Sequence, residues 1–271
     1  MSGGYLWNTT QTPTPTPTLC RFYRLMDNQS IISEFYLRGI SGFPEQQLLL
    51  YGIFLCMYLV TLTGNVLIIL AICSDPHLHT PMYFFLANLS FADMGLISST
   101  VTKMLFNVQT QRHTISYTGC LTQMYLFMMF GDLDSFFLAV MAYDRYVAIC
   151  RPLHYSTIMN TGFCALMLAL CWVLTNIVAL THTLLMARLS FCVVGEIAHF
   201  FCDITSVLKL SCSDTHVNEL VLSGFGGTVL MVPFVPMILQ GLVEDNFSTA
   251  DPNYSFLGPL NESHERPFLS L

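Results

Sequence analysis

The sequence predicts an all-α membrane protein, and three observations carry that prediction. Only 10% of the 271 residues are charged and 54% are hydrophobic, whereas a soluble domain usually carries about 25% charged residues. Several apolar runs reach the ~20 residues that a helix needs to cross a bilayer. A lone segment in lipid must satisfy its own backbone hydrogen bonds, so each run is expected to be a helix.

The chain divides into three predicted parts. Residues 1–47 are polar and irregular, and we expect a largely disordered extracellular segment because the TPTPTPT run at 12–18 favours extended polyproline II. Residues 48–243 hold the transmembrane bundle, and residues 244–271 form a polar, acidic tail. Five spans are expected, at about 48–73, 82–106, 121–144, 163–185 and 217–243.

The sidedness of the chain follows from its sequons and loop cysteines. Asn8 and Asn28 begin N-glycosylation sequons, which suit an outer location. Cys192, Cys202 and Cys212 lie at ten-residue spacing in a polar loop, as on an oxidising extracellular face. The Lys and Arg distribution opposes this orientation, but charges in long segments weigh little in the positive-inside rule. We therefore expect the N-terminus outside.

Ionisable and polar side chains occur at membrane depth. Asp134 and Arg145 are eleven residues apart, which places them within roughly 20° of one helix face, and this face is expected to look into the bundle. Asp132 points nearly the opposite way, while Asp93 and Asn65 belong to the second and first spans. Intramembrane ionisable groups favour a functional site. The alternative is a hydrogen-bonded network that only fixes helix packing.

Five segments of the chain carry a family resemblance. They are GNVLIIL, PMYFFLANLSFADM, MAYDRYVAICRPLHYSTIM, HFFCDI and LKLSCSDT. Together they resemble an olfactory receptor, a rhodopsin-like G-protein-coupled receptor, over roughly residues 26–240. The extended block around Asp-Arg-Tyr is far more specific than those three residues alone. The resemblance implies a rhodopsin-like helical bundle, of which this chain would hold about five of the usual seven transmembrane helices.

The resemblance assigns a switch to the inner end of the third span. Asp144, Arg145 and Tyr146 match the family's switch, in which the Asp–Arg pair holds the resting state and the freed arginine faces the G protein. Such a pair is a two-state element whose equilibrium a ligand can bias. The alternative is an anchor at headgroup level, which many span ends carry.

The resemblance also implies an interior polar cluster and two disulfides. The cluster comprises Asn65, Asp93 and Asp134, beside which the family has a sodium site. The implied disulfides are Cys120–Cys202 and Cys192–Cys212. Free thiols are the alternative, and they suit an outer face poorly.

The implied odorant pocket lies between the outer halves of the third, fifth and sixth helices. The third helix would contribute Phe127, Met128, Gly131 and Asp132. Aromatic and thioether side chains suit small volatile apolar ligands, although ordinary interhelical packing explains each of them equally well. The expected partners are a small odorant, a heterotrimeric stimulatory G protein, the plasma membrane and other receptors with which the chain could pair.

Other classes of function lack support in the sequence. The net charge of −7 excludes a basic nucleic-acid footprint. We find no nucleophile–base constellation and no phosphate loop. Cys202, which the resemblance places in a disulfide, cannot also serve as a thiolate ligand of a metal. We therefore expect no enzyme, no cofactor and no metal site. A transporter would show internal repeats or paired broken helices, and the sequence has neither.

The resemblance fades near Gln240. The family's basic third inner loop and its sixth and seventh helices have no counterpart in residues 244–271. We therefore expect a receptor that is truncated or divergent beyond that point. Poor folding, retention in the endoplasmic reticulum and weak or absent signalling would follow, so the alternative function is a non-signalling receptor product.

Overall fold

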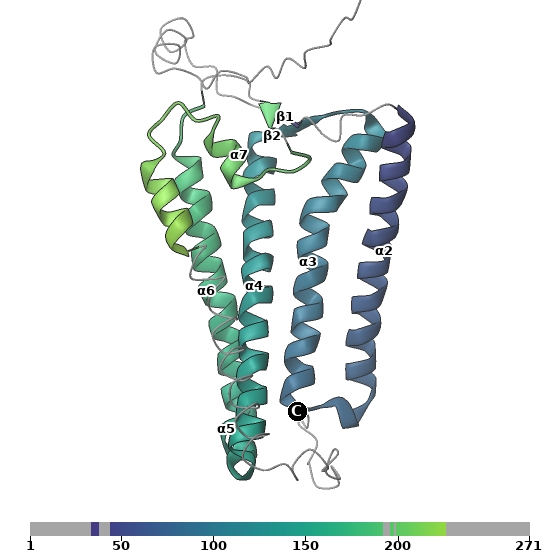
Figure 1. Cartoon of the computed structure of the whole chain (residues 1–271), viewed down its shortest axis with the longest axis vertical. Coiled ribbons are helices and arrows are strands. Elements are labelled where there is room, and N and C mark those ends of the chain that lie inside the picture. The colour runs from purple at the N-terminus through teal and green to yellow at the C-terminus, as the bar shows by residue number, and fades with distance from the viewer. Residues whose placement is uncertain (1–33, 38–43, 192–195, 198, 226–271) are drawn as a thin grey trace, which may run out of the picture.

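A computed structural model describes residues 34–37, 44–191, 196–197 and 199–225. Four helices in this part are long and apolar enough to cross a membrane. They are α2 (Pro44–Ser74), α3 (Pro81–Thr110), α4 (Tyr117–Cys150) and α6 (Thr161–Ala187), and they form an elongated bundle (Figure 1). The prediction of a helical membrane protein is confirmed, and each helix extends a few residues beyond the predicted span.

Local capping fixes where these helices begin. Ser116 precedes α4, and its hydroxyl accepts a hydrogen bond from the Gly119 backbone N–H at 3.1 Å. Asn160 precedes α6 and accepts from the Phe163 N–H at 2.9 Å. Each cap satisfies a backbone donor that has no partner within the first helical turn. The starts of α4 and α6 are therefore determined by the residues that immediately precede them.

The bundle is ordered α2, α3, α4, α6, with each helix packed against the next (Figure 1). Phe85 and Ala92 of α3 and Leu133 and Phe137 of α4 are fully buried in one cluster. On α2, by contrast, large apolar side chains such as Leu48 remain exposed. Contiguous apolar surface of this extent is rare on soluble monomers, and it fits a helix whose outer face meets lipid.

The fifth predicted span is covered only at its beginning. Residues 216–225 are helical, whereas most of 217–243 lies outside the described residues. The count of five spans therefore stays a prediction. The tail at 244–271 and the sequons at Asn8 and Asn28 also lie outside the described part.

A three-stranded sheet closes one end of the bundle, in the order β2-β1-β3. β1 (Glu34–Leu37) pairs antiparallel with β2 (Thr114–Ser116) and parallel with β3 (Glu196–Ile197). We call this end, with the sheet and the short helix α7 (Ile204–Leu208), the sheet end (Figure 1).

The sheet shows an ordered part within the N-terminal segment. The structure gives an ordered strand at 34–37, within residues 1–47 that we expected to be largely disordered. Residues 1–33 and 38–43 lie outside the described part of the chain, so that expectation stays a prediction. Phe35 and Leu37 alternate with exposed Glu34 and Tyr36 and are themselves buried. The strands that pair with β1 lie far along the chain, so the alternation in these four residues does not predict a strand until the tertiary fold is known.

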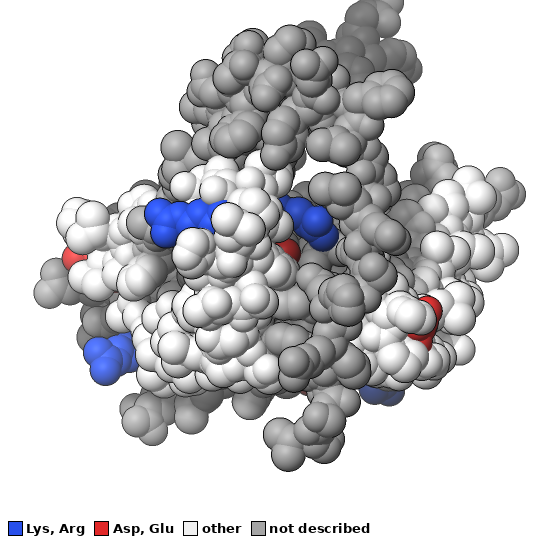
Figure 2. Space-filling view, turned by 90° about the horizontal axis from the view of Figure 1, so that it is seen from below, with Lys and Arg blue, Asp and Glu red and all other residues white. Residues whose placement is uncertain are grey.

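The opposite end of the bundle is built from short local turns. It contains η1 (Pro76–Leu78), η2 (Pro152–His154) and α5 (Tyr155–Ile158), and we call it the α5 end. The Asp75 carboxylate caps η1 by accepting from the His77 N–H at 2.9 Å. Figure 2 views the molecule from this end, where uncharged surface predominates and basic and acidic side chains are scattered.

Candidate functional site

The sheet end has a compact core of its own. Cys120 of α4 and Cys202 of the loop before α7 form a disulfide that closes a sequence separation of 82 residues. Both cysteines are 1% exposed. Buried side chains from all three strands, α4, α6 and α7 surround the disulfide: Phe35, Leu37, Ile115, Met124, Met186, Ile197, Ile204, Val207 and Leu208. The strands and the loop therefore share one core with the disulfide.

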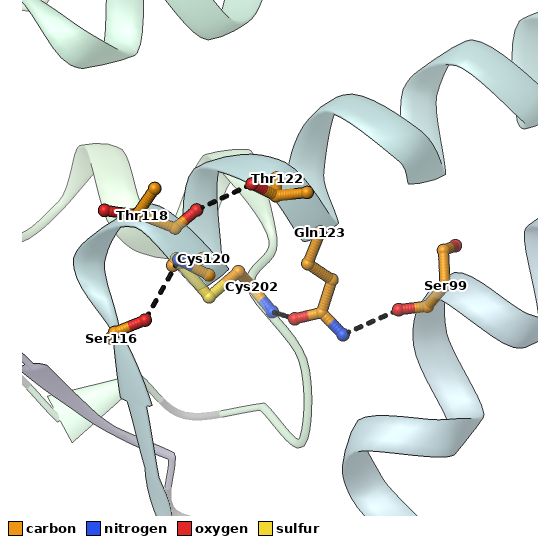
Figure 3. The surroundings of a disulfide bond; sticks show 8 residues. Ser99, Ser116, Thr118, Cys120, Thr122, Gln123 and Cys202 are labelled. Carbon is orange, nitrogen blue, oxygen red and sulfur yellow. Dashed lines mark hydrogen bonds between the residues drawn. A yellow bond between two sulfur atoms is a disulfide. The ribbon is translucent and has the colours of Figure 1, made fainter.

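Gln123 adds a polar bridge beside this disulfide (Figure 3). Its amide nitrogen donates to the Ser99 carbonyl of α3 at 2.9 Å, and its amide oxygen accepts from the Cys202 N–H at 3.1 Å. Gln123 is buried, so these bonds satisfy polar groups that water does not reach. Our sequence analysis missed this residue. Its position three residues after Cys120, on the same helix face, was the available signal.

The second implied disulfide stays a prediction, because Cys192 lies outside the described residues. The chain segments that flank it are nevertheless side by side. Phe191 pairs with Ser211 in an antiparallel bridge, and the Cys212 N–H donates to the Ser190 carbonyl at 2.9 Å. This pairing is compatible with a Cys192–Cys212 bond.

The four residues proposed for the odorant pocket occupy different surroundings on α4. The Phe127 ring lies 5.3 Å from the Phe201 ring of the loop, and Met128 packs against the core of the sheet end. Gly131 lies near Leu96 of α3, which a Cβ would meet at 3.9 Å. Asp132 is half-buried, and its Oδ2 has no hydrogen-bond partner in the described part of the chain.

The interior polar residues are brought together in part. Asp93 of α3 and Asp134 of α4 lie within electrostatic reach of each other. The Asn65 amide donates to the Thr61 carbonyl at 3.1 Å, so this hydrogen bond stays within α2. Across the described ranges, no group of three His, Cys, Asp or Glu side chains gathers as a metal site would require.

The Asp144–Arg145–Tyr146 segment ends α4 with its two charges in different environments. Asp144 is 1% exposed, and its carboxylate accepts a hydrogen bond from the Tyr155 hydroxyl of α5 at 2.8 Å. Arg145 is exposed, and Tyr146 is half-buried against the bundle core. Successive helical residues are turned ~100° apart, so one side chain of the pair faces inward and the other faces outward.

The structure places the two charged residues of the predicted inward face in different surroundings. We expected Asp134 and Arg145 to share a face that looks into the bundle. Asp134 lies within electrostatic reach of Asp93 on α3 and its Oδ1 atom is buried, whereas Arg145 is exposed. The most deeply buried stripe of α4 runs instead through Leu133, Phe137 and Asp144. The eleven-residue spacing aligned two charges correctly but gave no information on which side the neighbouring helices lie.

A polar contact between α4 and α6 also escaped the sequence analysis. The Tyr125 hydroxyl donates to the Asn176 side-chain oxygen at 2.5 Å, and the Asn176 amide donates to the Trp172 carbonyl at 2.7 Å. A polar side chain that bonds across helices stabilises packing where lipid offers no alternative partner. The polar residues within each apolar run were visible in the sequence, but which of them pair across helices could be known only from the fold.

Comparison with known proteins assigns this arrangement to a family. A family model described as olfactory receptor matches residues 54–240. The chain is 80% identical over 213 residues to Olfactory receptor 1N1 of Homo sapiens, covering 79% of this chain and 68% of that protein. It is 61% identical over 213 residues to human Olfactory receptor 1N2, covering 79% and 67%. It is 56% identical over 214 residues to Olfactory receptor 1500 of Rattus norvegicus, covering 79% and 69%. The chain belongs to the olfactory receptor family.

Proposed function

We propose that this chain detects small volatile odorants at its sheet end and couples, through its α5 end, to a stimulatory G protein. Family membership supports the receptor class over an enzyme. The observation that carries the coupling is the separation of charges at the end of α4, where Asp144 is buried and Arg145 is exposed. An exposed guanidinium at a bundle end is available to a protein partner, while the buried Asp144 carboxylate accepts a hydrogen bond from the Tyr155 hydroxyl.

The α5 end offers a second feature that suits a G protein. Leu153 is 92% exposed and follows the exposed Arg151. A projecting leucine beside basic residues resembles the apolar anchors with charged rims that protein interfaces use. Under this proposal, Leu153 enters an apolar pocket of the partner while Arg145 and Arg151 contact its polar surface.

The ligand would bind beside α4 near Phe127, Met128, Gly131 and Asp132. Phe127 already lies against Phe201 of the loop, so an apolar ligand there would contact aromatic side chains from two elements. Asp132 has a buried oxygen without a partner in the described chain, and under this proposal a ligand hydroxyl donates to it. These features support a pocket that recognises shape and offers few polar contacts.

The test is a cyclic AMP response in cells that also express the stimulatory G protein. A chimera would join residues 1–240 to the part of human Olfactory receptor 1N1 that lies beyond the match, because the matched part is 68% of that protein. We expect a panel of small volatiles to yield at least one agonist, and Arg145→Ala to abolish its response without lowering surface level. Cyclic AMP responses that survive Arg145→Ala would contradict the proposed coupling.

A second candidate concerns the 271-residue chain expressed by itself, which we propose is a non-signalling membrane protein retained in the endoplasmic reticulum. The family match that stops at residue 240 favours it. Surface labelling of an N-terminally tagged chain, with glycosidase digestion, checks this. Glycans of the immature type on Asn8 and Asn28, with little surface label, are expected. Mature glycans and an odorant response would exclude this candidate.

A further inference from the structure

Two adjoining hollows lie between α2 and α3 at the sheet end, away from the residues proposed for the odorant pocket. The larger hollow, which we call the α2–α3 groove, has a volume of about 340 Å³ and is lined by both helices. The smaller one, the inner cavity, has a volume of about 20 Å³ and lies under Leu37 of β1 and Phe200 of the loop. Gln47 and Val108 line both hollows, so the groove and the cavity adjoin each other.

The inner cavity holds an unsatisfied polar group. Asn107 of α3 lines it and is 4% exposed. The Asn107 Oδ1 atom has no hydrogen-bond partner in the described part of the chain. A buried acceptor without a donor is costly, and native structures satisfy most such groups. A cavity of this size holds about one water molecule, or one hydroxyl group, so a missing donor fits there.

The chemistry of the lining restricts the ligand. Among the residues that the structure describes, no Asp, Glu, Lys or Arg side chain lines either hollow. The polar contributions come from amides, the Tyr51 phenol and the His113 ring, whereas Leu48, Met104 and Phe200 add apolar surface. An ionised ligand would lose its hydration without gaining a charged partner. A neutral molecule with one hydroxyl and an apolar body loses little hydration free energy on entering such a site.

We propose that the α2–α3 groove and the inner cavity form a binding site for a neutral, hydroxyl-bearing amphiphile. Its hydroxyl donates to Asn107 Oδ1, and its apolar body lies along Leu48, Tyr51 and Val108. The proposal stands independently of odorant detection, because its lining residues are not those proposed for the odorant pocket. A long-chain alcohol or sterol from the bilayer and a short alcohol from water share this chemistry, and the test separates them.

The test uses the full chain in lipid nanodiscs with a diazirine-bearing long-chain primary alcohol as the probe. After illumination, mass spectrometry locates the label. We expect saturable labelling in the peptides that contain 47–51 and 104–113. The methyl ether of the same probe should label at least about fivefold less, which is the effect of losing one neutral hydrogen bond. Equal labelling by alcohol and ether, or unsaturable labelling spread along all of α2, would overturn the proposal.

Two competitors identify the source of the ligand. Cholesterol added to the nanodisc lipid should reduce labelling if the site takes its ligand from the bilayer. 1-Hexanol added from water should reduce labelling if the site takes a soluble alcohol. Competition by either one supports the site and assigns its source, whereas competition by neither contradicts it.

Variants locate the acceptor within the site. Asn107→Leu keeps the side-chain shape and removes the acceptor, so labelling by the alcohol should fall at least about fivefold. Asn88→Leu is the matched control on the same helix, where the Asn88 amide donates to the Phe84 carbonyl at 2.8 Å, and its labelling should not change. Should Asn107→Leu fail to fold, the comparison of alcohol with ether in the natural chain still decides the outcome.

Discussion

The two ends of the bundle are held by different kinds of interaction. At the sheet end, a disulfide, three strands and the Gln123 bridge join segments that are distant in sequence. At the α5 end, short turns connect neighbouring helices, and one described side-chain hydrogen bond, from Tyr155 to Asp144, fastens α5 to α4. Local unfolding costs more free energy where a disulfide and long-range contacts hold a segment than where only local turns do. From this difference we expect the sheet end to open less readily than the α5 end.

Removing the disulfide should give the largest effect. Cys202→Ser opens a link between residues 82 positions apart, and the loss of loop-closure constraint at that separation is about 4 kcal/mol in stability. Thermal unfolding of the purified chain in detergent measures it. Cys56→Ser is the control, because Cys56 is an exposed residue of α2, and it should change stability by less than about 0.5 kcal/mol. Similar losses in both variants would mean that the disulfide does not hold the sheet end together.

Truncating the buried face of β1 comes next. Phe35 is fully buried and its ring lies 5.5 Å from that of Phe191, so Phe35→Ala should destabilise the sheet end by about 3 kcal/mol. Tyr36→Ala is the matched control, since Tyr36 is 43% exposed on the same strand, and its loss should stay below about 1 kcal/mol. The free energy of unfolding decides between them, and a greater loss from Tyr36→Ala would show that the strand faces the other way.

A smaller effect is expected at the α5 end. Tyr155→Phe removes the donor to the buried Asp144 carboxylate, at a cost of about 2 kcal/mol for a bond to a charged acceptor. Because the contact is local, faster proteolysis within 151–160 should report the loss, while the thermal unfolding midpoint moves little. Tyr143→Phe is the control, since Tyr143 is an exposed residue near the same end of α4. Unchanged proteolysis in Tyr155→Phe would mean that this hydrogen bond does not hold α5.

The smallest effect should come from the middle of the bundle. Tyr125→Phe deletes the hydroxyl that donates to Asn176, and interhelical hydrogen bonds in membrane proteins contribute about 0.6–2 kcal/mol. We expect a loss of about 1 kcal/mol by unfolding in detergent. The double variant with Asn176→Leu should lose little more than the more damaging single change, because both changes remove the same contact. Fully additive losses would argue against a direct bond.

Sequence reasoning captured what is encoded locally and missed what depends on the fold. The first four spans were predictable because a helix needs ~20 consecutive apolar residues to cross a bilayer, and such runs can be read directly from the sequence. β1 was missed because its partners at 114–116 and 196–197 are remote in sequence. The family resemblance supplied the residues that we propose as a switch, but it did not indicate that the Tyr155 hydroxyl would donate to Asp144. Gln123 and Asn107 looked like ordinary polar residues until their neighbours were known.

Hydrogen–deuterium exchange of the full chain in nanodiscs, with and without reduction of the Cys120–Cys202 disulfide, tests most directly whether the sheet end is one rigid unit. We predict slow exchange at 34–37 and 114–116 in the oxidised chain. After reduction, both strands should lose protection together, while exchange at 151–160 stays fast and unchanged. Protection of β1 that survives reduction, or a loss of protection that appears first at the α5 end, would contradict this account.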